Sequence, residues 1–186
     1  MNILEALAAR RSIKRFADRP VSRAQIEGVL DAAVLAPNFR LTQPWRFYVL
    51  GPTARAKYGL ALGDRKANKA PDPEAARAIR ERTVEEYRAL PAMIAVAMVV
   101  AESAEAAEED FAAVMMAIQN LLLAALEAGL GTHVRTGAVM SDPAARIAIG
   151  VPEGQRVVAT ISLGVPAETP MGKARQPASS HTIWVG

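Results

Sequence analysis

The chain has 186 residues, the length of one ordinary domain, and we expect residues 1–186 to fold as a single unit. It holds no cysteine and two histidines, which excludes disulfide frameworks, thiolate catalysis, iron–sulfur clusters and zinc sites built on cysteine or on several histidines. A formal net charge of +3 at pH 7 permits an anionic ligand without requiring nucleic acid.

We predict a soluble, cytoplasmic protein that binds no metal. The first residues lack the cationic head and apolar run of a signal peptide, and no stretch of about 20 apolar residues is present to span a bilayer.

In the first half of the chain, apolar residues recur at helical spacing over residues 2–10 and again after Ser22, where Ser22 and Gln25 form a capping box. Pro37 ends this second helix, because the residue before a proline avoids the helical region. The elements expected next are a strand at 46–50, a helix at 53–62, a polar loop at 63–73 and a charged helix at 74–90. With few apolar anchors, residues 64–90 are expected to be mobile.

In the second half, the apolar run at 93–100 predicts a strand buried on both faces. The helix expected at 110–128 is apolar on every side, so it should be buried on every side. The remaining expected elements are strands at 132–135 and 156–163, a helix that begins at Asp142 and Pro143, and an extended surface tail over 164–186. Interleaved helices and few strands predict a three-layer α/β or α+β sandwich.

Familiar catalytic motifs are missing from the chain. It lacks a G-x-G-x-x-G stretch after a strand, a P-loop, G-x-S-x-G and H-E-x-x-H. The chemistry that remains is one in which the protein positions a cofactor and supplies charge.

Basic residues cluster in two places. Residues 10–16 (RRSIKRF) combine arginine with serine, the donors that suit a phosphate, and the tail adds Lys173 and Arg175. Without a ligand, both runs would simply be solvated charge.

Two further segments could hold a flat ligand. Residues 36–47 (APNFRLTQPWRF) form a proline-fixed loop whose Asn38 and Gln43 amides can donate and accept in one plane, although a tight connection with a core Trp45 fits equally well. In residues 129–137 (GLGTHVRTG) the glycines permit close approach to a ring, whereas His133 is read as structural.

Together these segments resemble the FMN-dependent nitroreductase family, nearly from end to end. RRSIKRF is similar to the family's R-R/H-S-x-K/R-x-F, and APNFRLTQPWRF to its A-P-S-x-x-N-x-Q-P-W-x-F. MAIQNLLLAALEAGLGT resembles the family's central helix with its Gly-Leu-Gly turn, and GKARQP its closing K-x-R-x-P. The resemblance implies an α+β fold, a three-layer α/β/α sandwich with a central mixed sheet, in an interleaved homodimer with FMN at the interface.

The resemblance also implies a cofactor-binding role for thirteen residues. The FMN phosphate would be held by Arg10, Arg11, Ser12, Lys173 and Arg175. Lys14 would lie near the pyrimidine end of the ring as the stabiliser of the flavin anion. Pro37, Asn38 and Phe39 would line the ring with Gln43 as support, and Arg135, Thr136 and Gly137 would reach it from the partner subunit.

This chain departs from the family pattern at three positions. Leu41 stands where the family has asparagine, Asn38 and Phe39 replace the small residues after the proline, and Thr136 replaces a frequent acidic residue. These departures are typical of the small, compact branch of the family.

The implied function is reduction of nitroaromatics, quinones or similar flat acceptors by NADH or NADPH, through FMN, in a ping-pong reaction. Residues 64–90 would cover the site as a lid. Two alternatives are a nitroreductase-fold flavoprotein with other flavin chemistry, such as dehydrogenation or dehalogenation, and a non-catalytic binder of anions or nucleic acid. The basic residues at 10–15 motivate the last alternative, but the chain lacks the long basic face and interleaved aromatics of nucleic-acid binders.

Overall fold

A four-stranded sheet lies at the centre of the computed structural model, which describes residues 2–186. The strands are β1 (Trp45–Val49), β2 (Ala92–Val99), β3 (Gly131–Arg135) and β4 (Gln155–Gly164), in the order β1-β2-β4-β3. All three strand pairs are antiparallel, whereas the resemblance implied a mixed sheet; the sheet is therefore an antiparallel one. Outside these strands, an isolated bridge pairs Ser12 with Thr132 in parallel.

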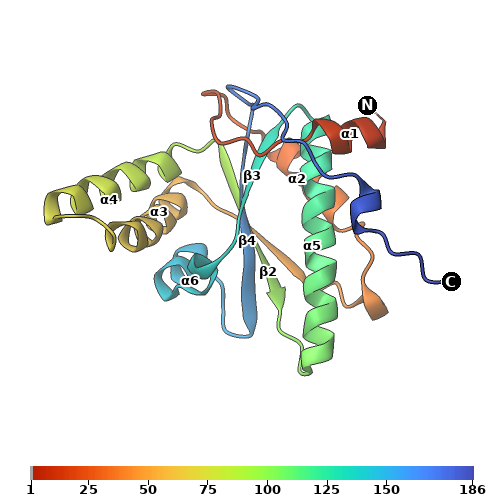
Figure 1. Cartoon of the computed structure of the whole chain (residues 1–186). Coiled ribbons are helices and arrows are strands. Elements are labelled where there is room, and N and C mark those ends of the chain that lie inside the picture. The colour runs from red at the N-terminus through yellow and green to blue at the C-terminus, as the bar shows by residue number, and fades with distance from the viewer. Residues whose placement is uncertain (1) are drawn as a thin grey trace.

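Helices cover both faces of this sheet, which confirms the three-layer α+β architecture (Figure 1). The helices are α1 (Ile3–Ala9), α2 (Arg23–Ala33), α3 (Pro52–Ala67), α4 (Pro73–Arg88), α5 (Ala104–Glu127) and α6 (Pro143–Ile149). α2 and α5 pack on one face, where their side chains form one apolar cluster with the sheet. α3, α4 and α6 lie on the other face, over a second cluster.

Local capping explains where several helices begin. Asn2 and Glu5 form a capping box at α1, and Ser22 and Gln25 form the expected one at α2. Asp142 accepts from two backbone amides at the start of α6, as its position before a proline predicts.

Two helices are longer than the sequence pattern indicates. α3 continues to Ala67, so the loop expected at 63–73 shrinks to 68–72. The reason is that Gly59 and Gly63 face α4: a Cβ on Gly59 would lie 2.9 Å from the Thr83 carbonyl oxygen. These glycines allow two helices to pack closely and do not end α3. α5 likewise starts at Ala104 behind a Ser103 cap, and its acidic first turns lie before the apolar stretch.

α5 is long and apolar enough, by length and composition alone, to cross a membrane, with a mean hydropathy of 1.4. Its Val114, Ile118 and Leu121 are buried against the sheet, as in the central helix of a globular core. The expectation of burial on every side is not met within one chain, because Met115 and Met116 are exposed.

Candidate functional site

A cavity of about 940 Å³ opens between α4 and the β3 edge of the sheet. This volume lies in the range of small-molecule sites. Its wall contains three of the predicted cofactor-binding residues: Lys14, Arg135 and Thr136. The other lining residues are Phe16, Ala17, Asp18, Glu86, Tyr87, Ala89, Leu90, Pro91, His133, Val134 and Ser162.

Lys14 reaches the cavity because the segment around it runs beside β3. The Ile13 amide donates to the Thr132 carbonyl over 2.8 Å, and the Ile13 side chain is buried. Gly131 makes this approach possible, since a Cβ there would lie 2.5 Å from Ile13 Cγ1. Main-chain bonds therefore fix the backbone of Lys14, whose side chain is exposed.

The same segment is joined to the tail. The Ala17 amide donates to the Val165 carbonyl over 2.8 Å, and the Ala167 amide to the Arg15 carbonyl over 3.0 Å. Further along the tail, Gly172 lies so close to the Arg11 guanidinium that any Cβ would collide with it. The structure thus brings both basic clusters of the sequence to one side of the molecule.

The phosphate-binding candidates do not all have the same freedom. Arg11 Nη1 donates to the Ala8 carbonyl over 2.6 Å and to the Arg10 carbonyl over 2.9 Å, so this guanidinium is held over the end of α1. Arg175 Nη1 donates to the Lys173 carbonyl over 3.2 Å. Ser12 is exposed beside its bridge to Thr132. None of these residues lines the 940 Å³ cavity, and Arg10 and Arg11 line a separate cavity of about 130 Å³.

Charges of both signs face the cavity. Lys14 and Arg135 supply positive charge, and Asp18 and Glu86 supply negative charge. Burial, with added repulsion from Arg135 and then Lys14, lowers the pKa of His133 below its ordinary value of 6.5. His133 is therefore neutral at pH 7.

Arg135 is connected across the cavity to α4. Its Nε donates to the Tyr87 hydroxyl over 2.9 Å. Burial raises the pKa of the Tyr87 phenol, and the positive charge of Arg135 opposes that rise without cancelling it. The phenol therefore stays neutral and accepts the bond.

Sequence reasoning missed several cavity residues. His133 could have been found, because residues 133 and 135 lie two apart on a strand and so point to the same face. Tyr87 and Glu86 gave no such signal, since they lie about 45 residues before β3 and meet it through tertiary packing alone.

The loop predicted to line the ring lies elsewhere. Thr42 donates to the Asp110 carboxylate of α5 over 2.6 Å, which places the loop on the α5 face of the sheet (Figure 1). The cavity is on the α4 side, and none of residues 37–43 lines it within the described chain. Pro37, Phe39 and Gln43 are exposed.

This loop is strained and internally braced. Arg40, Leu41 and Gln43 have positive φ values of 54°, 54° and 44°, a region that side chains rarely occupy. The Asn38 side chain accepts from the Gln43 amide over 3.0 Å, so Asn38 supports the loop and Gln43 contributes its main chain. Strain of this kind is frequent at ligand sites.

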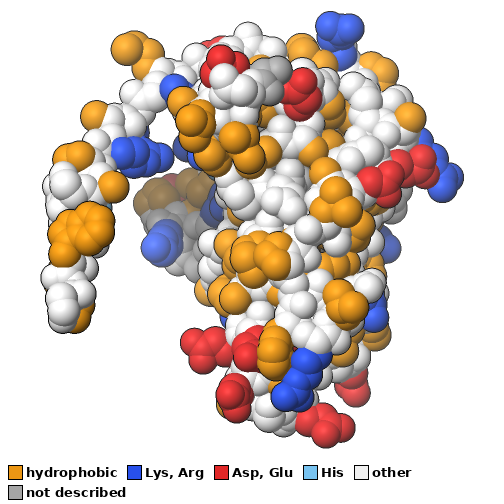
Figure 2. All heavy atoms as spheres, turned by 90° about the vertical axis from the view of Figure 1, so that its right-hand side faces the viewer, with side chains coloured by type: hydrophobic (Ala, Val, Ile, Leu, Met, Phe, Trp, Pro, Cys, Tyr) orange, Lys and Arg blue, Asp and Glu red, His pale blue; other side chains and the backbone are white. Residues whose placement is uncertain are grey.

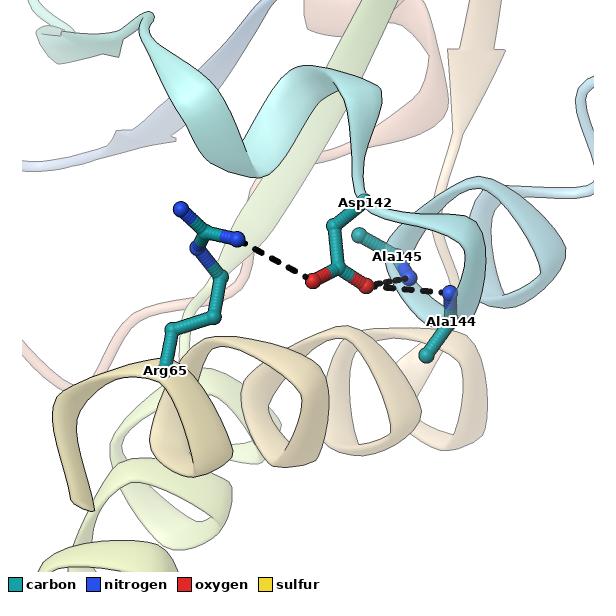
Figure 3. Close-up of polar contacts among 4 residues, drawn as sticks. All are labelled: Arg65, Asp142, Ala144 and Ala145. Carbon is teal, nitrogen blue, oxygen red and sulfur yellow. Dashed lines mark hydrogen bonds and ion pairs between the residues drawn. The ribbon is translucent and has the colours of Figure 1, made fainter. Parts of the chain in front are cut away.

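The chain that leaves the cavity after β3 is fastened to α3. Gly137, with a φ of 97°, turns it into a short 3-10 helix, Ala138–Ser141. Figure 3 shows Asp142 at the end of this turn, where one oxygen accepts from the amides of Ala144 and Ala145. The other oxygen lies 3.4 Å from Arg65 Nη1 of α3.

Comparison with known proteins gives consistent results. The family model described as "Nitroreductase family" matches residues 7–165. A Bacillus subtilis protein named as an NAD(P)H nitroreductase, YfhC, is 33% identical over 178 residues, which cover 93% of this chain and 89% of YfhC.

Two solved structures are similar over the whole chain. A nitroreductase-like family protein from Bacillus cereus has a TM-score of 0.87 and 27% identity, covering 100% of this chain and 96% of that one. A protein from Desulfovibrio desulfuricans, described as a nitroreductase in complex with FMN, has a TM-score of 0.74 and 26% identity, covering 100% and 98%. With its fold, its cavity and these matches, the chain belongs to the nitroreductase family.

Proposed function

We propose that this protein reduces nitroaromatics, quinones or similar flat acceptors with electrons from NADH or NADPH, and that it does so in the cytoplasm. The chain is an FMN- and NAD(P)H-dependent oxidoreductase of its family. The observation that carries the proposal is the cavity in which Lys14 and Arg135 lie together beside the basic segment.

The residues present fit FMN. The cavity has the volume of a ligand site, cations face it, and two clusters of basic residues meet beside it. FMN held there would supply the redox chemistry, a hydride and electron carrier between the nicotinamide and the acceptor. Lys14 and Arg135 would stabilise negative charge at the pyrimidine end of the ring, as preorganised cations in a partly enclosed site do.

Phosphate recognition is assigned to the basic residues outside the cavity wall. Arg10, Ser12, Lys173 and Arg175 would donate to the phosphate oxygens. Arg11 would also act on the phosphate by its charge, because two of its hydrogen bonds already go to carbonyls of the chain. Flat acceptors would enter between α4 and β3, where Phe16 and Leu90 offer apolar surface.

The active unit is proposed to be a homodimer. α1 exposes Ile3 and Leu4, α5 exposes Met115 and Met116, and Figure 2 shows hydrophobic side chains along this face. The end of the tail stands clear of the body, with Trp184 90% exposed. Exposed apolar surface on this scale marks an interaction site, and a second copy would cover it.

Dimerisation would also complete the cavity. In this arrangement the loop at 37–43 of one copy lines the cavity of the other and brings Pro37, Asn38 and Phe39 to the ring. The division of residues between subunits then differs from the one expected from sequence. Lys14, Arg135 and Thr136 act from the same chain, and the loop comes from the partner.

The visible spectrum of the purified protein tests the proposal. We expect oxidised-flavin bands, release of FMN on denaturation, and oxidation of NADH or NADPH in the presence of nitrofurazone or a quinone. A flavin-loaded protein that turns over none of these acceptors would favour other flavin chemistry. A colourless protein that takes up no FMN, and whose DNA affinity falls steeply with salt, would instead support the anion-binding alternative.

A further inference from the structure

The hydrogen bond from Arg135 Nε to the Tyr87 hydroxyl joins β3 to the last turn of α4 across the cavity. We propose that Tyr87 is a positioning residue, which holds the Arg135 guanidinium toward the bound cofactor and couples the α3–α4 hairpin to the site. This inference rests on the proposed function, because that function supplies the cofactor that Arg135 would bind.

The geometry of the bond leaves Arg135 able to bind. A guanidinium has five N–H donors in a planar fork, and the bond to Tyr87 uses the one on Nε. The four donors on the terminal nitrogens are not consumed by it. The bond therefore orients the fork without blocking the nitrogens that would face a ligand.

Tyr87 is a firm anchor for this purpose. Its side chain is 9% exposed, and its ring lies 5.3 Å from that of Tyr58, at 50°. A Cβ on Gly59 would lie 2.9 Å from Tyr87 Cβ, so α3 and α4 touch closely here. Tyr58 in turn shares a 3.3 Å hydrogen bond with Thr160 of β4, which connects the hairpin to the sheet.

The neighbouring carboxylate explains why Arg135 needs an anchor. Glu86 precedes Tyr87 and lines the same cavity. Without the Tyr87 hydroxyl, the Arg135 side chain would be free to turn toward Glu86, whose ion pair with Arg82 is 3.6 Å long and whose carboxylate accepts more strongly than a phenol does. The positive charge would then be neutralised instead of facing the cofactor.

The same contact bears on the predicted lid. Residues 64–90 form part of a closely packed hairpin, so a motion of this segment would carry α3 and α4 together. Such a motion would have to break the Tyr87–Arg135 bond. Opening of the cavity would thereby also release Arg135 from its binding position.

The test compares Tyr87→Phe with Tyr58→Phe in the FMN-loaded protein. Both changes remove one buried hydroxyl from the same tyrosine pair, but Tyr58 bonds Thr160 and lies outside the cavity wall. For Tyr87→Phe we expect kcat/KM to fall about tenfold, the flavin potential to become more negative and FMN affinity to weaken, in keeping with loss of one hydrogen bond to a charged group. Tyr58→Phe should lower the melting temperature and leave the potential unchanged.

A double-mutant cycle separates positioning from a structural role. In the Arg135→Ala background, Tyr87→Phe should change neither the potential nor the FMN dissociation constant further, because its effect passes through Arg135. Arg135→Lys, which alters no core residue, should reproduce the potential shift of Tyr87→Phe.

Additive effects in the cycle, or a wild-type potential in both Tyr87→Phe and Arg135→Lys, would overturn the inference. In that event wild-type protein that still binds FMN and turns over would leave the proposed function standing. Wild-type protein without FMN or turnover would reject the function and, with it, this role of Tyr87.

Discussion

Two regions carry the predicted ring-binding residues, and they are built differently. The segment around Lys14 is hydrogen-bonded to β3 and to the tail, and it faces a cavity within its own chain. The loop at 37–43 lies on the opposite face of the sheet, with three residues at positive φ and Phe39 exposed. One half of the proposed site is therefore held on the sheet, and the other proposed half is a strained loop that faces outward.

The difference indicates how the site is divided. Backbone strain of this kind costs on the order of 1–3 kcal/mol for each residue and persists where its surroundings fix it. For the loop, the fixing contacts include the Thr42–Asp110 bond and the Asn38–Gln43 bond. A strained loop with nothing to bind in its own chain is explained if its ligand belongs to the partner.

The largest effect is expected at the cavity wall. Lys14→Ala should lower the rate of flavin reduction on the order of 100-fold, because one preorganised charge is lost where negative charge develops. The flavin potential should become more negative in step. Arg19→Ala, at an exposed basic residue outside the cavity wall, is the control. A Lys14→Ala protein with wild-type potential and rate would rule out this role.

The second effect concerns the loop. Asp110→Ala removes the acceptor of the bond from Thr42 and should cost about 1.5–3 kcal/mol of unfolding free energy, the range for hydrogen bonds to charged groups. FMN affinity should fall as well, although Asp110 is not in the cavity wall. Denaturant unfolding and FMN titration measure the two, with exposed Asp31→Ala as the control. Loss of stability with unchanged FMN affinity would separate the loop from the cofactor site.

A third, smaller change tests the close approach behind Lys14. Gly131→Ala puts a Cβ 2.5 Å from Ile13 Cγ1 and should destabilise the protein by about 1–3 kcal/mol through overpacking. Gly28→Ala, in the interior of α2 with nothing within 4 Å, should instead stabilise it by about 0.5–1 kcal/mol. Thermal unfolding compares them, and equal melting temperatures would contradict the packing account.

The smallest effect is a pH dependence of stability at the wall. The pKa of His133 is lower in the folded protein than the ordinary 6.5, so the unfolded chain binds the proton more readily. The contribution of His133 to the free energy of unfolding is complete above pH 6.5 and is lost as the pH falls through the pKa of His133 in the folded protein. His133→Gln should flatten this slope between pH 7.5 and 5, whereas His181→Gln in the exposed tail should not. Equal slopes in wild type and His133→Gln would place the titration elsewhere.

Much of the fold follows from local sequence signals. The capping box at Ser22, the proline behind Asp142 and the apolar run of β2 each mark an element that the structure confirms. The prediction failed where a residue has a tertiary role. Gly63 was read as a helix end, but it is a contact point between α3 and α4.

Only part of the cavity's composition, and none of its arrangement, could be predicted from the sequence. Lys14 and Arg135 stand out through the motifs that surround them, and the structure places both in one cavity. No pattern in one chain shows that residues 37–43 lie across the sheet from that cavity, or that Tyr87 meets Arg135. Both facts depend on packing between segments that are distant in sequence.

A hybrid-dimer experiment tests the central claim, that each cavity is completed by the partner's loop. Lys14→Ala and Asn38→Ala each impair one half of the proposed site, and the two impaired proteins are unfolded together, refolded as a mixture and assayed for NAD(P)H-dependent reduction. If the loop acts in the partner's cavity, half of the randomly assorted dimers are hybrids with one intact site, and roughly a quarter of wild-type activity returns. If no activity returns above that of the separate variants, the loop and Lys14 serve the same chain and the account is wrong.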